Sequence, residues 1–104
     1  MQDFNLTKQG NTLTVYISCE LDHHKAVGLR DAIDKRLTDG GIKLLVLDFS
    51  GVPFMDSSGI GLIMGRADKA SETGCRVSVT GLIPTLSRLV RLSGISKLEN
   101  LEIN

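Results

Sequence analysis

Apolar and polar residues alternate in the first part of the chain. Phe4 and Leu6 stand between polar neighbours, and so do Leu13, Val15 and Ile17 after a Gln-Gly-Asn turn. A period of two is typical of a strand with one buried face. The turn between the two runs predicts that they pair as an antiparallel hairpin.

A helical period follows the hairpin. Leu29, Ile33 and Leu37 recur at every fourth position, which predicts an amphipathic helix. Asp22 stands just before this pattern, where a carboxylate can cap the first turn. A Gly-Gly pair at 40–41 is a typical helix end.

The middle of the chain predicts a strand and a second helix. The run 42–49 is almost entirely apolar, which favours a central strand covered on both faces. The second helix is predicted from about Ser58 to Thr73. Its expected buried stripe consists of Ile60, Ile63, Met64 and Ala67.

The last part predicts a strand at 76–80, a third helix that begins near Pro84 and ends at Gly94, and a short final strand. Strands that alternate with helices favour parallel pairing through right-handed crossovers. The predicted fold class is therefore α/β. Residues 1–104 would form a single domain with a mixed β-sheet, an antiparallel N-terminal hairpin followed by parallel βα units, and helices packed against it.

Composition and charge narrow the classes of function. The chain has 12 Lys and Arg against 12 Asp and Glu, whereas a nucleic-acid-binding protein usually carries a basic excess. No apolar stretch approaches the length of a membrane span, and the start at 1–4 lacks the features of a signal peptide. Cys19 and Cys75 lack metal-ligand spacing, so we expect reduced thiols in a cytoplasmic protein without nucleic-acid or membrane partners.

The segment 54–61, Phe-Met-Asp-Ser-Ser-Gly-Ile-Gly, joins the central strand to the second helix. Asp56 and the two serines after it are good helix caps. Capping alone does not account for the glycines at 59, 61 and 65, each of which costs about 1 kcal/mol in a helix interior relative to Ala. We therefore expect another surface to approach this segment closely.

Enzymatic interpretations of the segment fail on the residues they require. A hydrolase built on Ser57 needs Gly where Met55 stands, and its base would have to be His23 or His24 at an exposed helix start. A nucleotide-binding fingerprint needs a third Gly where Met64 stands. We expect no catalytic residue and no cofactor.

A metal site is also disfavoured. Asp22, His23, His24 and Asp56 are the candidate ligands, but adjacent histidines on a helix point about 100° apart. They cannot easily share one ion, so no metal is expected.

Two segments carry a resemblance to a known family. The segment 54–61 resembles the phosphorylation-site motif of bacterial anti-sigma factor antagonists, which contain the sulfate transporter and anti-sigma antagonist (STAS) domain. Glu-Leu-Asp-His-His at 20–24 is similar to a segment of the sporulation branch, the anti-sigma-F factor antagonists. Ser93-Gly94 stands where the family has its Ser-Gly, and the likeness runs from about Leu13 to Leu98.

The resemblance implies a phosphorylation-switched binding module that is not an enzyme. Its unphosphorylated form would bind a kinase-type anti-sigma factor, a serine kinase, and so release the sigma factor. Phosphorylation would end the binding, and a serine phosphatase would reset the protein. The implied phosphoacceptor is Ser57, with Asp22, Asp56 and Ser58 as its neighbours and Asp22 orienting its hydroxyl. The implied partner-binding residues are Glu20, Gly59, Ile60 and Gly61.

Two departures from the family pattern stand out. Cys19 occupies a position where the family usually has Gly. The sequence also stops at Asn104, before the further C-terminal helix that many members carry, so that helix is either absent or lies beyond this sequence. The alternative function is a STAS-domain subunit of another regulatory or lipid-transport assembly. Such relatives can lack the phosphorylatable serine, so the Asp-Ser-Ser sequence favours the sigma-factor role.

Overall fold

The computed structural model describes residues 3–104. Met1 and Gln2 lie outside the described residues, and they belong to the start of the chain where no signal peptide is predicted. The chain begins with the predicted hairpin, in which β1 (Phe4–Gln9) pairs antiparallel with β2 (Thr12–Ile17). Gly10 makes the turn with a φ of 62°, a conformation that glycine adopts without strain.

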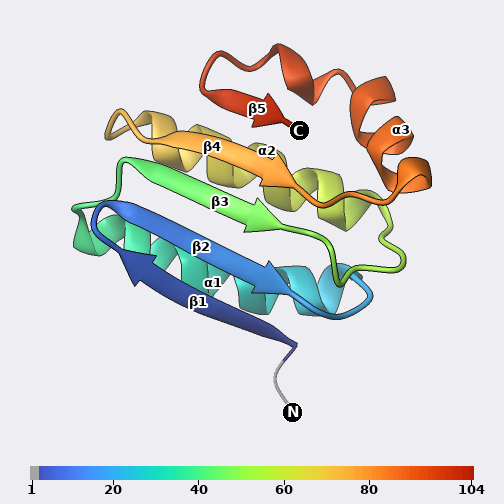
Figure 1. The fold of residues 1–104 in the computed structure, drawn as a ribbon, viewed down its shortest axis with the longest axis horizontal. Helices are drawn as coiled ribbons and strands as arrows, with labels where there is room; N and C mark the ends of the chain where they lie inside the picture. Colours follow the sequence, from blue (N-terminus) through green and yellow to red (C-terminus); the bar gives the residue numbers. More distant parts are fainter. Residues whose placement is uncertain (1–2) are drawn as a thin grey trace.

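Three parallel strands complete the sheet. They are β3 (Leu44–Asp48), β4 (Arg76–Thr80) and β5 (Leu101–Ile103), and the strand order is β1-β2-β3-β4-β5. Each of β2, β3 and β4 pairs with the next strand in parallel. The predicted α/β fold with a mixed five-stranded sheet is confirmed (Figure 1).

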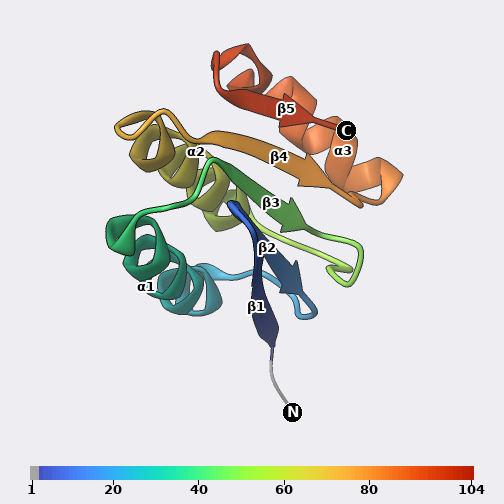
Figure 2. The same ribbon diagram turned by 60° about the vertical axis from the view of Figure 1, so that its left-hand side comes forward.

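The crossovers between parallel strands are helical. They are α1 (His23–Asp39), α2 (Ser57–Ser71) and α3 (Pro84–Leu92), and a short 3₁₀ turn η1 (Ile95–Lys97) precedes β5. Helices α1 and α2 lie side by side on one face of the sheet (Figure 2). Because consecutive crossovers step in the same direction along the sheet, right-handed connections place them on the same face.

The prediction that the central strand is covered on both faces is wrong. Leu45 and Leu47 on β3 are fully buried under the helices, but Leu44 and Val46 are only half-buried. On the same open face Tyr16 of β2 is 45% exposed. Among residues 3–104, the core therefore forms between the helices and one face of the sheet.

The predicted buried stripe of α2 is partly wrong. Ile63 and Ala67 are buried, Ile60 is half-buried, and Met64 is 48% exposed. The buried face of α2 is formed by Gly59, Leu62, Ile63, Arg66, Ala67 and Ala70. The stripe is rotated around the helix relative to the prediction, and this rotation brings a charged residue, Arg66, against α1.

Candidate functional site

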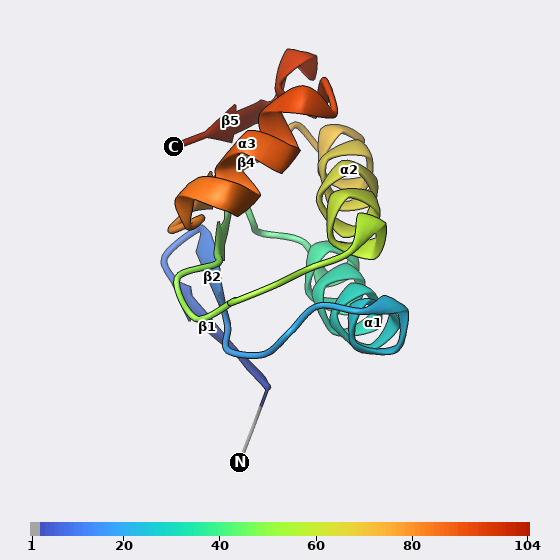
Figure 3. The same cartoon turned by 90° about the vertical axis from the view of Figure 1, so that its right-hand side faces the viewer.

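Two loops at the carboxyl-terminal end of the sheet are hydrogen-bonded to each other. The Leu21 N–H donates to the Phe54 carbonyl at 3.0 Å, and the Asp56 N–H donates to the Leu21 carbonyl at 3.2 Å. These bonds form a one-residue parallel bridge between Leu21 and Met55, both of which are 1% exposed. Helices α1 and α2 consequently begin next to each other at one edge of the molecule, the edge that faces the viewer in Figure 3.

Both helices are capped by an aspartate. Asp22 Oδ1 accepts a hydrogen bond from the Lys25 N–H at 2.8 Å, and Asp56 Oδ1 accepts one from the Ser58 N–H at 2.8 Å. Each cap satisfies a backbone donor that the first turn leaves free. The predicted N-cap roles of Asp22 and Asp56 are confirmed, because both carboxylates are used by their own helices.

Ser57 is the first residue of α2, and its side chain is exposed. Ser58 is half-buried. A helix N-terminus presents free N–H groups and a partial positive charge, so a negative group on Ser57 would be tolerated there. Of the two serines, Ser57 is the more exposed.

The other residues implied by the resemblance surround this helix start. Glu20 and Gly61 are exposed, and Ile60 is half-buried. Within residues 3–104, no hydrogen bond joins Asp22 to the Ser57 hydroxyl, so the orienting role of Asp22 stays a prediction.

The glycines of α2 have different surroundings. Gly59 is buried, and a Cβ added to it would collide with the Met55 Sδ and lie 3.0 Å from the Met55 Cβ and Cγ. Its lack of a side chain is therefore needed inside the protein. A Cβ on Gly61 or Gly65 would meet nothing within 4 Å, so these two glycines leave open space beside α2.

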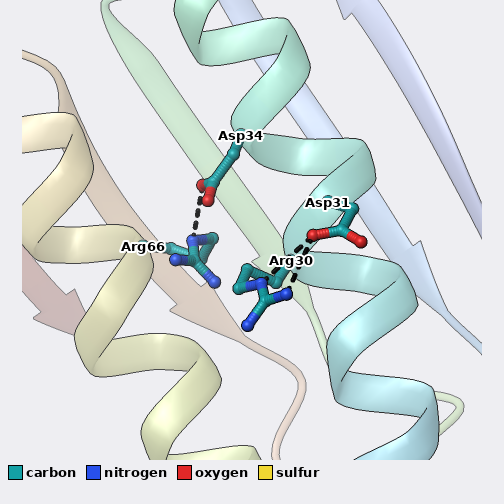
Figure 4. A network of polar contacts seen from close by, with 4 residues as sticks. All are labelled: Arg30, Asp31, Asp34 and Arg66. Atoms are coloured by element: carbon teal, nitrogen blue, oxygen red, sulfur yellow. Dashed lines mark hydrogen bonds and ion pairs between the residues drawn. The ribbon is translucent and has the colours of Figure 1, made fainter.

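A groove of about 220 Å³ runs between α1 and α2 from this edge. It is lined by His23, Ala26, Val27, Arg30, Ser58, Gly61, Leu62 and Arg66. Arg66 Nε lies 2.8 Å from Asp34 Oδ1 in an ion pair without the geometry of a hydrogen bond, and Arg30 pairs with Asp31 at 3.1 Å (Figure 4).

Sequence patterns did not single out Arg66. The available signal was its position four residues after Leu62, which places it within a stripe of Leu62, Ile63, Ala67 and Ala70. That stripe can be recognised only when it is known which face of α2 is buried.

Both cysteines are free thiols. Burial raises the pKa of the Cys19 thiol and of the Cys75 thiol above their ordinary value of 9.0. They are therefore poor nucleophiles at neutral pH. Within residues 3–104, no cluster of three or more His, Cys, Asp or Glu side chains could hold a metal ion. No helix in that range is long and apolar enough to cross a membrane.

Comparisons with known proteins give a consistent assignment. The STAS domain model matches residues 3–103. The anti-sigma F factor antagonist of Paenibacillus polymyxa is 35% identical over 86 residues, which are 83% of this chain and 74% of that protein.

Two solved structures of the anti-sigma factor antagonist SpoIIAA are similar to this fold. The unphosphorylated form has a TM-score of 0.78 at 24% identity and covers 97% of this chain and 86% of its own. The phosphorylated form, described as a Bacillus cell fate determinant, has a TM-score of 0.77 at 26% identity and covers 97% of this chain and 90% of its own.

Proposed function

This chain belongs to the STAS domain family, and we propose that it is a phosphorylation-switched anti-sigma factor antagonist. The unphosphorylated form binds a kinase-type anti-sigma factor, and the sigma factor is released. Phosphorylation of Ser57 ends this binding, and a serine phosphatase restores it. The chain performs no catalysis in this scheme and acts in the cytoplasm, during sporulation if it follows its relatives.

The single observation that carries the proposal is the exposure of Ser57 at a helix start that hydrogen bonds hold in place. The hydroxyl stands on the first residue of α2, beside an Asp56 cap and a loop bonded to the neighbouring loop. A kinase can reach this side chain without opening the core. The same edge carries Glu20, Ile60 and Gly61, the proposed docking residues, so a partner bound there would lie over the acceptor.

Phosphorylation would act through charge rather than through refolding. It adds about −1.5 to −2 charges at neutral pH. The α2 N-terminus accommodates part of this charge, whereas Asp56 and Asp22 oppose it. Two unit charges 4 Å apart interact by about 4 kcal/mol at an effective dielectric of 20. A change of that size, felt across an interface, corresponds to about a thousandfold change in affinity.

The test is incubation with a candidate anti-sigma kinase and ATP, followed by mass spectrometry of the intact and digested protein. One phosphate on Ser57 is expected, and Ser57→Ala should still form the complex while taking up no phosphate. Ser58→Ala is the matched control and should be phosphorylated normally. Phosphate on the Ser57→Ala protein at the wild-type rate would refute the assignment. Absence of both complex and phosphate would favour a STAS subunit of another regulatory or lipid-transport assembly.

A further inference from the structure

The groove between α1 and α2 is lined by basic side chains and by no acidic one. Its lining contains three basic side chains, His23, Arg30 and Arg66, together with the Ser58 side chain, and no acidic side chain. The acids that pair with the two arginines, Asp31 and Asp34, do not line it. The groove therefore offers the hydrogen-bond donors of two guanidiniums whose carboxylate partners stand outside its lining.

Arg66 is the principal feature of this groove. Its side chain is 9% exposed, and only Nε faces Asp34, while the terminal nitrogens turn away from that carboxylate (Figure 4). Nε is therefore engaged with the Asp34 carboxylate, at 2.8 Å from Oδ1. A guanidinium has five N–H donors, so the pairing of Nε with Asp34 leaves the four N–H groups of the two terminal nitrogens. Because Arg66 lines the groove, these terminal N–H groups are available to an anion there.

Arg30 approaches from the opposite wall. Its contacts with Asp31 both go to one carboxylate oxygen, which leaves other donors of the guanidinium free. Burial lowers the pKa of Arg66, and the positive charge of Arg30 lowers it further, whereas Asp34 opposes the shift. Two cations that repel each other across a groove are stabilised by an anion between them.

We propose that this groove binds a phosphate-type dianion between the Arg30 and Arg66 guanidiniums. Planar guanidinium groups match phosphate oxygens in a two-pronged arrangement, and the Ser58 hydroxyl and the α2 N-terminus supply further donors. The anion comes either from free phosphate in solution or from a phosphoryl group carried on Ser58. The site does not depend on the proposed switch at Ser57.

The test is a titration of the unphosphorylated full chain with inorganic phosphate at constant ionic strength, followed by NMR. Saturable shifts are expected at the Arg30 and Arg66 side-chain N–H groups and at the Ser58 and Gly61 amides. Arg30→Gln, which keeps the pair of Arg66 and Asp34, should weaken phosphate binding about tenfold, the value of one charge-assisted hydrogen bond.

A matched control and a second groove variant keep the result interpretable. Arg88→Gln removes an exposed arginine of α3 outside the groove and should leave the phosphate affinity unchanged. Arg66→Gln combined with Asp34→Asn removes the ion pair without leaving a lone buried charge, and it should weaken binding as Arg30→Gln does. Shifts that do not saturate, or an equal affinity in Arg30→Gln and Arg88→Gln, would overturn the proposal.

A second arm identifies the source of the phosphate. The chain is prepared with phosphoserine genetically encoded at position 58, so that no kinase is needed. If its own phosphoryl group fills the groove, this protein no longer binds free phosphate, and Arg30→Gln raises the phosphoryl pKa measured by ³¹P NMR. If it still binds free phosphate, the groove takes phosphate from solution. Both results keep the groove as the binding site.

Discussion

The two glycines at the start of α2 should respond in opposite directions to the same substitution. Gly59→Ala places a methyl group against Met55, a buried side chain whose atoms would lie at 3.0 Å or closer. Overpacking of this kind costs about 1–3 kcal/mol. Gly61→Ala meets nothing within 4 Å and gains only the helix propensity of alanine, about 1 kcal/mol.

The propensity gain is roughly common to both variants, so the difference between them isolates the contact with Met55. We expect Gly61→Ala to be more stable than Gly59→Ala by about 1–3 kcal/mol in the free energy of unfolding. Urea denaturation with an unchanged m-value measures this difference, which corresponds to about 4–12 °C in melting temperature for a chain of this size. Equal stability of the two variants would refute the packing argument for Gly59.

A binding assay tests the proposed role of Gly61 on the docking face. Gly61→Ala should bind the proposed partner, an anti-sigma kinase, about tenfold more weakly although it is more stable, because the methyl group stands on the proposed docking face. Gly65→Ala, which is one turn further along α2 and equally free of contacts, is the matched control. Unchanged kinase affinity of Gly61→Ala would remove Gly61 from the docking face.

Three further predictions concern caps, charges and thiols. Asp22→Ala and Asp56→Ala should each lower the free energy of unfolding by about 1 kcal/mol. Asp22→Asn and Asp56→Asn should keep most of the wild-type stability, because Asn also caps helices. Equal losses in the Ala and Asn variants would contradict the capping role. Asp34→Ala should lower the free energy of unfolding by about 1–3 kcal/mol, a value discounted for the 27% exposure of Asp34. The double variant Asp34→Leu with Arg66→Met should recover most of this loss in urea denaturation, because it leaves no unpaired buried charge. No recovery would contradict a charge effect. The folded-state pKa of Cys75 is raised, so the contribution of its thiol to stability is present below pH 9.0 and is lost as the pH rises through the raised pKa. The melting temperature of the Cys75→Ala protein should therefore fall less at alkaline pH than that of the wild type. An identical fall would show that the Cys75 thiol does not cause the alkaline loss of stability.

Local signals in the sequence predicted the elements, and their ends to within about two residues. Asp22 and Asp56 were identified as caps because a cap needs only an aspartate and an N–H two or three residues later. The hairpin followed from a period of two and a glycine turn. Parallel pairing of the later strands followed from the alternation of strands and helices, whereas the order of the strands in the sheet came from the structure.

Features that depend on tertiary contacts could not be predicted in this way. The apolar run around Val46 is compatible with one covered face or with two, because its pattern does not say what lies above the sheet. The phase of α2 was wrong at Met64 because the glycine-rich first turn carries few apolar markers. The groove around Arg66 depends on the position of α1, which no pattern within α2 contains.

The bridge between Leu21 and Met55 affects how a kinase can recognise this protein. A kinase that binds its substrate as an extended peptide would have to break both backbone hydrogen bonds of the bridge, lose the Asp56 cap and expose Met55. Local opening of that kind would approach the cost of opening the core beneath it. The proposed acceptor, Ser57, therefore stands on a folded surface that joins two distant segments, and a kinase would select it by shape rather than by a linear motif.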